Sequence, residues 1–388
     1  MLSSVASVCQ RHFSCYQDAT LGKVRRPART SHFPKDLGNS VAVPLHQKIL
    51  SSKNTRVSFV TRRREGARLC AQKQRNTGRL VCLSSSSSLG VVITGGTKGF
   101  GYALSKELLK GGDRVMLCGR DSDRVADAVA SLQESVPGCS VYGVRCDVAC
   151  PGDVSELAAA ASRDLGTVHL WINNAAHISE PKPLFEVQQE DLAAVVGTNV
   201  LGSILCCREA INLMRKQKGA EGSVPLYHIF NFGFSPWGAA LSSAVCTHKA
   251  TKTGLAQLNT SLADELNRAG IRSIGVHNLS PGMVLTDLLI KGSNPISRRI
   301  FNALAEEPET VAASLAPKVR SISGNNGSIE FLTLPDAIRR MVTGLPQIIN
   351  GGRFFDKQGD RVRVEGDEYK ENGVRLLYRN LVKEERQE

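Results

Sequence analysis

"VVITGGTKGFGYALSKELL", residues 91–109, joins a short apolar run to an amphipathic helical pattern through a glycine-rich turn. Glycines at such a turn let the chain reverse tightly and let a pyrophosphate approach the backbone N–H groups at the start of a helix. A glycine-rich turn alone is weak evidence, but a strand before it and a helix after it make the signal specific. The stretch therefore predicts a nucleotide-binding unit, with cofactor contacts from Gly95, Thr97, Lys98, Gly99, Phe100 and Gly101.

Apolar strand-like runs alternate with amphipathic helical stretches from Leu89 onward. This alternation predicts an α/β fold with a doubly wound parallel sheet, as one domain over residues 89–290. Residues 291–388 contain two helical patches and too few apolar residues for a core of their own, so we expect a helical extension packed on the sheet. The strand-like runs are residues 90–94, 114–118, 140–144, 168–172, 226–230 and 271–276, and the helical patches are residues 308–319 and 335–342.

The basic charge of the chain lies in its first 88 residues. They hold 16 Lys/Arg and 3 acidic residues, a net charge of +13, whereas the other 300 residues are balanced. Because the charge of the folded part is balanced, it does not indicate a nucleic-acid-binding surface there. This arm is rich in Ser and Arg, lacks periodicity and ends in five serines, which is typical of an organelle transit peptide. A disordered basic tail that stays attached is the alternative.

The cysteine spacing argues against a metal site, and the hydropathy of the chain argues against a membrane span. The chain has 11 cysteines, 7 of them after residue 88, and none shows Cys-x-x-Cys spacing. We therefore expect no metal site and buried thiols in a reducing compartment. No run of 18 apolar residues occurs, so we expect no membrane span.

The second strand-like run ends in Cys118-Gly119-Arg120. An enzyme that uses NAD usually carries an acidic side chain here, which binds the ribose hydroxyls. Arg120 would instead form a charge-assisted pair with the 2′-phosphate of NADPH, and Lys98 in the turn adds a second cation. Asp121 next to it weakens this argument. The alternative is that both cations are solvated surface charges.

Four motifs in order resemble the short-chain dehydrogenase/reductase family. Thr94-Gly95 opens its Thr-Gly-x-x-x-Gly-x-Gly turn, and residues 173–176, Asn-Asn-Ala-Ala, resemble its Asn-Asn-Ala-Gly strand end. The resemblance implies adenine contacts after the third strand and nicotinamide contacts in a Pro-Gly-x-x-x-Thr loop. The implied cofactor-binding residues are Asp147, Val148, Asn174, Ala175, Lys252, Pro281, Gly282, Val284 and Thr286.

The same resemblance implies a catalytic set with one departure. Lys252 takes the position of the lysine that binds the nicotinamide ribose, and Asn199 that of the asparagine of the proton relay. Ser235 stands 13 residues before position 248, the family's usual interval, although serines also occur at positions 242 and 243. His248 occupies the place of the family's tyrosine acid. Because Lys252 lies one helical turn away, we expect its charge to lower the pKa of His248 and to leave a poorer proton donor.

Residues 89–365, including the stretch after the Pro-Gly loop, resemble the chlorophyll(ide) b reductases, in the branch without membrane spans. The resemblance implies reduction of the formyl group of chlorophyll b or chlorophyllide b by NADPH in the chloroplast. Phe232, Phe234 and Trp237 would then stack on the pigment, or else belong to the core.

Two other functions fit the same residues. One is a catalytically weak NADPH-binding partner of an active reductase or of light-harvesting complexes, and the other is reduction of a different carbonyl compound in the plastid. The implied location is the stroma or the stromal face of the thylakoid, with peripheral attachment left open.

Overall fold

The computed structural model describes residues 88–241, 245–291 and 293–378 of the 388-residue chain. The predicted N-terminal arm, apart from Ser88, lies outside these residues. Its role as a transit peptide therefore stays a prediction.

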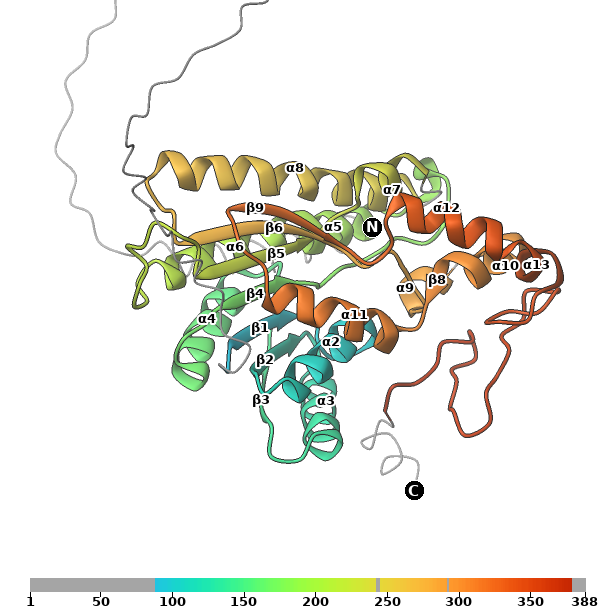
Figure 1. The fold of residues 1–388 in the computed structure, drawn as a ribbon, viewed down its shortest axis with the longest axis horizontal. Helices are drawn as coiled ribbons and strands as arrows, with labels where there is room; N and C mark the ends of the chain where they lie inside the picture. The colour runs from blue at the N-terminus through green and yellow to red at the C-terminus, as the bar shows by residue number, and fades with distance from the viewer. Residues whose placement is uncertain (1–87, 242–244, 292, 379–388) are drawn as a thin grey trace, which may run out of the picture. The chain divides into compact units, whose positions relative to one another are not determined.

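Seven parallel strands form one sheet in the order β3-β2-β1-β4-β5-β6-β9 (Figure 1). The order reverses between β1 and β4, and ligands of such sheets bind beyond the carboxyl ends of the strands at that point. The predicted doubly wound parallel sheet is confirmed, and six of its strands overlap the six predicted runs. The strands are β1 (Gly90–Thr94), β2 (Arg114–Gly119), β3 (Ser140–Arg145), β4 (Leu170–Asn173), β5 (Tyr227–Phe232), β6 (Ile274–Ser280) and β9 (Asn326–Glu330).

Helices cover both faces of the sheet. Successive residues of β1 point to opposite faces, Val91 and Ile93 into one hydrophobic core and Val92 into the other. A strand buried on both faces reads as a continuous apolar run, which is the pattern that the sequence shows. The first core is shared with α2 (Gly99–Lys110), α3 (Ser122–Ser135) and α11 (Pro308–Arg320), and the second with α4 (Pro151–Leu165), α6 (Gly202–Met214) and α8 (Cys246–Arg268).

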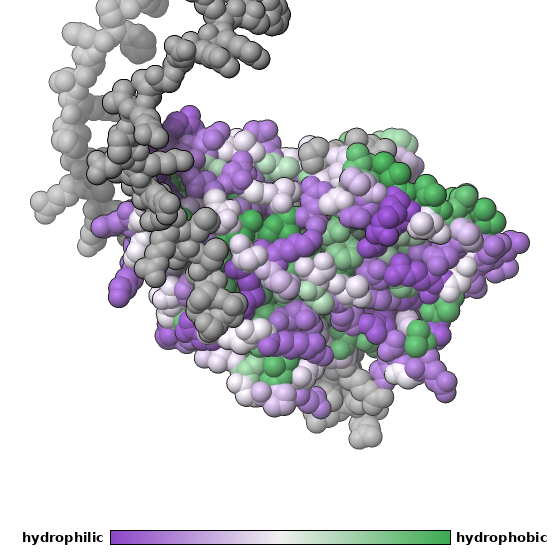
Figure 2. Space-filling view, in the orientation of Figure 1, coloured by the Kyte–Doolittle hydropathy of each residue, from purple (hydrophilic) through white to green (hydrophobic). Residues whose placement is uncertain are grey.

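The segment after β6 supplies helices and one strand of the sheet. α11 and α12 cover the two predicted helical patches, so the helical extension is present. β9 was not predicted, because Ile329 is the one buried apolar residue in this edge strand. Figure 2 shows hydrophobic side chains gathered on the surface where Figure 1 places α12 and α13. The segment comprises β7 (Met283–Val284), α9 (Asp287–Ile290), α10 (Pro295–Leu304), β8 (Ala305–Glu306), α11, β9, α12 (Leu334–Thr343) and α13 (Leu345–Asn350).

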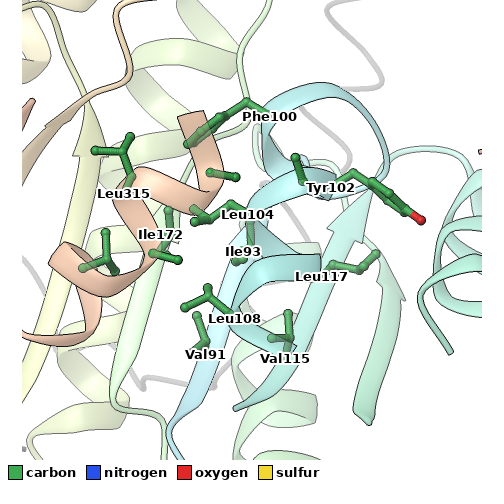
Figure 3. Close-up of a cluster of buried hydrophobic side chains, with 14 of the residues drawn as sticks. Val91, Ile93, Phe100, Tyr102, Leu104, Leu108, Val115, Leu117, Ile172 and Leu315 are labelled. Atoms are coloured by element: carbon green, nitrogen blue, oxygen red, sulfur yellow. The ribbon is translucent and has the colours of Figure 1, made fainter. Parts of the chain in front are cut away.

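The first core holds α2 in place against the sheet. Leu104 and Leu108, one helical turn apart, lie beside Ile93 and Val91 of β1, and Leu315 of α11 joins the cluster (Figure 3). Complete burial of a leucine side chain contributes about 1.5–3 kcal/mol. Since α2 begins at the glycine turn, these contacts also position that turn.

One helical stretch among the described residues passes for a membrane span by length and composition alone. It runs from Gln189 to Met214 and comprises α5 (Gln189–Val196), the π-helical turn η2 (Gly197–Leu201) and α6. Cys206, Cys207 and Ala210 of this stretch are buried in the second core. Val196, Leu201 and Ile204 of the same stretch are exposed, so the second core accounts for only part of its apolar side chains.

Candidate active site

Hydrogen bonds tie the glycine turn between β1 and α2 to the end of β4. The Nδ2 atom of Asn174 donates to the carbonyl oxygens of Thr94 (3.0 Å) and Gly95 (2.9 Å). The backbone N–H of Ala175 donates to Oγ1 of Thr94 (3.1 Å). A Cβ atom at Gly101 would lie 2.4 Å from both Asn174 Nδ2 and the carbonyl oxygen of Gly95, so only glycine fits there. These predicted residues therefore support the turn.

The start of α2 is suited to an anion. Gly99 begins the helix with a φ of 56°, Lys98 before it provides no side-chain cap, and the first turn has no acidic residue. The first N–H groups of a helix lack intrahelical partners and bind phosphate. Cγ2 of Thr286 would lie 3.1 Å from a Cβ at Gly99, which brings the predicted nicotinamide loop to this turn. The turn thus fits a dinucleotide pyrophosphate, whereas Phe100 packs on Phe232 in the core.

The cations predicted for a 2′-phosphate lie in different surroundings. Arg120 is exposed at the end of β2 and forms no ion pair with any residue that the structure describes. Asp121 accepts a hydrogen bond from the backbone N–H of Arg124 (3.1 Å) and so caps α3, and this bond lowers the pKa of its carboxyl. The ammonium of Lys98 lies 3.5 Å from Asp287. Arg120 is therefore an exposed cation without an ion-pair partner among the described residues, and the carboxyl of Asp121 is engaged by the first turn of α3.

Asp147 and Val148 form the loop after β3, on the predicted adenine side. Oδ1 of Asp147 accepts a hydrogen bond from the N–H of Ala149 (3.0 Å), and its own N–H donates to Asp153 (2.9 Å). Val148 is buried against Gly202 of α6. A Cβ atom at Gly202 would lie 2.7 Å from Cγ2 of Val148. The loop is thus held at both residues.

Asn199 connects the loop after β4 to the turn of α8 that carries His248 and Thr251. It is fully buried in η2, and π-helical turns of this kind are frequent at functional sites. Its Oδ1 accepts from the N–H of His177 (2.8 Å), and its Nδ2 donates to the carbonyl oxygen of His177 (2.9 Å) and to Oγ1 of Thr251 (3.2 Å). The hydroxyl of Thr251 in turn donates to the carbonyl oxygen of His248 (3.0 Å).

His248 and Lys252 lie one turn apart on α8 and are both buried. Burial lowers the pKa of Lys252 to about 8. Burial and, as the smaller cause, the charge of Lys252 lower the pKa of His248 to about 4. The sequence indicated only the charge of Lys252 as a cause of a lowered His248 pKa. In the structure, burial is the larger cause. The His248 ring is uncharged at neutral pH, and its buried Nδ1 has no hydrogen-bond partner among the described residues.

Ser235 lies in the loop that packs against the start of α8. It is 2 % exposed, and its Oγ accepts a hydrogen bond from the N–H of Gly238 (3.2 Å). The ring of Phe234 meets the ring of His248 edge to face, with centroids 5.8 Å apart. The alternative serines, residues 242–243, lie outside the described part of the chain, so the choice among the serines stays open.

Phe232 and Trp237 near this loop have structural contacts. Phe232 is buried against Phe100, with ring centroids 5.5 Å apart. The indole Nε1 of Trp237 donates to Glu330 (3.3 Å), which joins α7 (Pro236–Leu241) to β9. Phe232 therefore belongs to the core, one of the two roles left open for it.

The Pro281-Gly282 loop leads from β6 back to the glycine turn. Gly282 has a φ of 71°, and a Cβ there would lie 3.1 Å from that of Leu332. Val284 is buried, and its carbonyl oxygen accepts from the N–H (2.8 Å) and the hydroxyl (3.4 Å) of Thr286. These contacts therefore fix the backbone of the loop where the nicotinamide is expected.

Comparison with known proteins identifies the family. Residues 90–295 match the family described as short chain dehydrogenase. The chain belongs to the short-chain dehydrogenases. A solved 3-ketoacyl-(acyl-carrier-protein) reductase from Brucella melitensis, complexed with NADH, aligns with a TM-score of 0.53 and 26% identity over 62% of this chain and 95% of its own. The predicted family and its fold are confirmed, and a nicotinamide cofactor agrees with both.

Relatives of this short-chain dehydrogenase include two plant proteins. Chlorophyll(ide) b reductase NOL, chloroplastic, of Arabidopsis thaliana is 43% identical over 249 residues, which are 63% of this chain and 70% of that protein. Probable chlorophyll(ide) b reductase NYC1, chloroplastic, of Oryza sativa subsp. japonica is 38% identical over 288 residues, 70% of this chain. The chain spans 55% of the length of the rice protein.

Two residues near the candidate site, His177 and Tyr378, were not predicted from the sequence. Nε2 of His177 lies 2.9 Å from Oδ1 of Asp191, and His177 directly follows the Asn-Asn-Ala-Ala motif, which is the signal that marked it. The hydroxyl of Tyr378 donates to the carbonyl oxygen of Thr97 (2.5 Å). No local pattern predicts a contact between residues so far apart. No group of three His, Cys, Asp or Glu in the described ranges could hold a metal ion.

Proposed function

We propose that this chain reduces the formyl group of chlorophyll b or chlorophyllide b to hydroxymethyl, with NADPH as the cofactor. The observation that carries the proposal is the extent of its likeness to plant chlorophyll(ide) b reductases. The rice protein aligns over 288 residues, whereas the family domain covers residues 90–295, so the likeness includes sequence outside that domain.

The residues present suit the phosphorylated cofactor. The open start of α2 would bind the pyrophosphate, and Arg120 would pair with the 2′-phosphate. When bound, NADPH supplies the hydride for the carbonyl carbon. Asp147 and Val148 would line the adenine site, and the loop from Pro281 to Thr286 the nicotinamide side.

The side chains around α8 would complete the reduction. Lys252 would bind the nicotinamide ribose, since it is a buried cation without an ion-pair partner in the described residues. Ser235 would hydrogen-bond the substrate oxygen. Asn199 holds the backbone of His177 beside this turn, where a proton relay would pass. His248 stands where the acid is needed.

One observation favours a second function, a catalytically weak NADPH-binding partner of an active reductase or of a light-harvesting complex. An uncharged His248 ring gives up a proton far less readily than an imidazolium does. With a pKa of about 4, His248 is almost entirely uncharged at neutral pH. The glycine turn, Arg120 and Lys252 serve this function equally well.

Turnover of a defined substrate separates the two functions. The chain is mixed with NADPH and chlorophyllide b, and the product is identified by mass and absorption. A hydroxymethyl product that disappears in Lys252→Ala but persists in Lys249→Ala supports the reductase, because Lys249 is a lysine of the same helix outside the proposed site. Binding of NADPH without product, at every pH tried, supports the partner function. Turnover of other carbonyl compounds but not of the pigment would indicate a different reductase.

The plastid location belongs to the same proposal. The Ser- and Arg-rich arm of residues 1–88 is typical of a transit peptide, and the relatives from rice and Arabidopsis are named chloroplastic. A fusion of residues 1–88 to a fluorescent protein tests this: import into chloroplasts with cleavage of the arm is expected. A fusion that stays uncleaved in the cytosol would contradict it.

A further inference from the structure

The last part of the chain that the structure describes, residues 364–378, runs back to the glycine turn, and we call it the C-terminal segment. It follows α13 in the sequence and forms no helix or strand of its own (Figure 1). The hydroxyl of Tyr378 donates to the carbonyl oxygen of Thr97 in the turn. The guanidinium of Arg375 pairs with Glu309 at the start of α11. These contacts fix the C-terminal segment beside the candidate cofactor site.

Two lysines share one carboxylate oxygen at this place. The ammonium of Lys370 lies 2.7 Å from Oδ2 of Asp287, and that of Lys98 lies 3.5 Å from the same atom. The amide of Asn372 donates to the other oxygen, Oδ1 (3.0 Å). Burial acts to raise the pKa of Asp287, but the hydrogen bonds and the two ammonium charges outweigh it and hold the pKa below its usual value. Two ammonium groups around one ionised carboxyl leave a net positive charge.

A tight turn holds the backbone that carries Lys370. The N–H of Lys370 donates to the carbonyl oxygen of Val374 (2.9 Å), and the N–H of Gly373 donates to the carbonyl oxygen of Lys370 (2.9 Å). Gly373 has a φ of 82°, and Val374 is buried. The guanidinium of Arg375 bridges back to Asp367 (3.2 Å). The position of Lys370 is therefore set before any ligand binds, which limits the entropy that binding costs.

The lysine pair lies beside the start of α2, where a pyrophosphate is expected. Lys98 directly precedes Gly99, the first residue of that helix. Asp287 directly follows Thr286, whose Cγ2 would lie 3.1 Å from a Cβ at Gly99. The side chain of Lys98 is 61 % exposed and that of Lys370 is 39 % exposed, so a ligand can reach both. An ammonium has three donors, so Lys370 can hold Asp287 and a phosphate oxygen at the same time.

The charges at this place require a second cation if a pyrophosphate is to bind. A dinucleotide pyrophosphate is a dianion, and the start of a helix offers it N–H groups and about half a positive charge. Asp287 would repel it, and Lys98 alone does no more than offset Asp287. We propose that Lys370 is a cofactor-binding residue supplied by the C-terminal segment, whose ammonium pairs with the pyrophosphate of the nicotinamide cofactor. The inference rests on the cofactor of the proposed function and not on its pigment substrate.

Lys370→Met tests the contact, because methionine keeps much of the side-chain stem and removes the ammonium. Fluorescence titration of the full chain with NADPH and with NADH gives the two dissociation constants. Since both cofactors carry the pyrophosphate, we expect both constants to rise by the same factor. That factor should be about 5- to 20-fold, because partial exposure weakens a charge-assisted hydrogen bond. Lys357→Met, which alters an exposed lysine before the C-terminal segment, should leave both constants unchanged.

Asp287→Asn separates a phosphate-binding lysine from a structural ion pair. If Lys370 only tied the C-terminal segment to α9, breaking the pair from either side would weaken cofactor binding alike. With Lys370 on the pyrophosphate, the asparagine removes a negative charge beside the phosphates and leaves both ammonium groups to them. We therefore expect NADPH and NADH to bind about 2- to 5-fold more tightly to Asp287→Asn, the opposite of the effect of Lys370→Met. Thermal unfolding followed by circular dichroism checks that the variants are folded.

ADP-ribose identifies the part of the cofactor that Lys370 contacts, because it contains the pyrophosphate and lacks the nicotinamide. Calorimetric titration with ADP-ribose should show the same loss of affinity in Lys370→Met. A loss confined to NADPH and NADH would assign the effect to the nicotinamide loop and overturn the inference. Unchanged binding in Lys370→Met, or weaker binding in Asp287→Asn as well, would also overturn it. If the unaltered chain binds both cofactors and reduces no pigment, the proposed function fails and this inference stands.

Discussion

The hydroxyl of Tyr378 donates a hydrogen bond to the carbonyl oxygen of Thr97, 2.5 Å away, across 281 residues of sequence. The Tyr378 ring also packs on Tyr102 of α2, with ring centroids 4.6 Å apart. Burial raises the pKa of Tyr378 to about 12, so the phenol keeps its proton at any physiological pH. The C-terminal segment is thereby attached to the turn that is to bind the cofactor.

Replacing Tyr378 by phenylalanine should weaken cofactor binding. The variant keeps the ring contact and loses the bond to Thr97, so the glycine turn loses one support. A hydrogen bond contributes about 0.5–1.5 kcal/mol net, so we expect the dissociation constant to rise about 2- to 10-fold. Fluorescence titration with NADPH measures it. Tyr369→Phe is the control, because its hydroxyl accepts from Val364 within the same segment. An equal effect in both variants would mean that only the segment's general stability matters.

Arg120→Glu should discriminate between the two nicotinamide cofactors. A hydrogen bond to a charged group contributes about 1.5–3 kcal/mol, so the loss for NADPH should be about 10- to 150-fold, with a far smaller change for NADH. Titration of the variant with each cofactor measures the ratio. Arg163→Glu, an exposed arginine of α4 paired with Asp164, should leave both affinities unchanged. Equal losses for NADPH and NADH in Arg120→Glu would show that this residue does not read the 2′-phosphate.

The glycine turn and the parallel strands could be predicted because their causes are local. Gly99 needs a positive φ, and β1 is apolar on both faces, so the residues themselves carry the signal. β9 escaped prediction because an edge strand needs few apolar residues, and its place beside β6 comes from tertiary packing. The bond of Tyr378 to Thr97 depends on the whole fold. For His248, the sequence showed the neighbouring charge but not the burial that dominates its pKa.

A buried pair of histidines should make the fold sensitive to acid. Nδ1 of His228 lies 2.9 Å from Nε2 of His277, and burial lowers their pKa values to about 4 and about 3. Unfolding restores an ordinary pKa of about 6.5, so below that pH the unfolded chain binds protons that the folded chain does not. Stability from the pair is complete above pH 6.5 and decreases as the pH falls towards 4. At pH 5 the loss is about 2 kcal/mol per histidine.

Urea unfolding at pH 7 and pH 5 tests the histidine pair. The free energy of unfolding of the unaltered chain should fall between the two pH values. In His228→Gln with His277→Gln it should fall less, since glutamine does not titrate, although the variant starts from a lower stability. The same decrease in both proteins would mean that other groups cause the acid sensitivity.

His248→Tyr should raise turnover of the formyl substrate. At pH 8 only about one His248 ring in 10,000 carries the proton, given its pKa of about 4. Tyrosine would place the family's phenol beside Lys252, whose charge favours the phenolate and so lowers the pKa of the phenol. General acid assistance is worth about 100- to 10,000-fold in rate, and we expect a gain within that range. The gain should diminish above about pH 8, where Lys252 loses its proton.

His248→Phe separates the chemistry of the hydroxyl from its space-filling effect, because it differs from the tyrosine variant by one oxygen atom. We expect the phenylalanine variant to bind NADPH and to turn over no faster than the unaltered chain. Equal rates in the two variants would show that position 248 does not face the carbonyl. If all three proteins bind NADPH and none forms product, the partner function is favoured. If the unaltered chain is already fast with a flat pH profile, a group other than His248 supplies the proton, such as a bound water molecule in the Asn199 region.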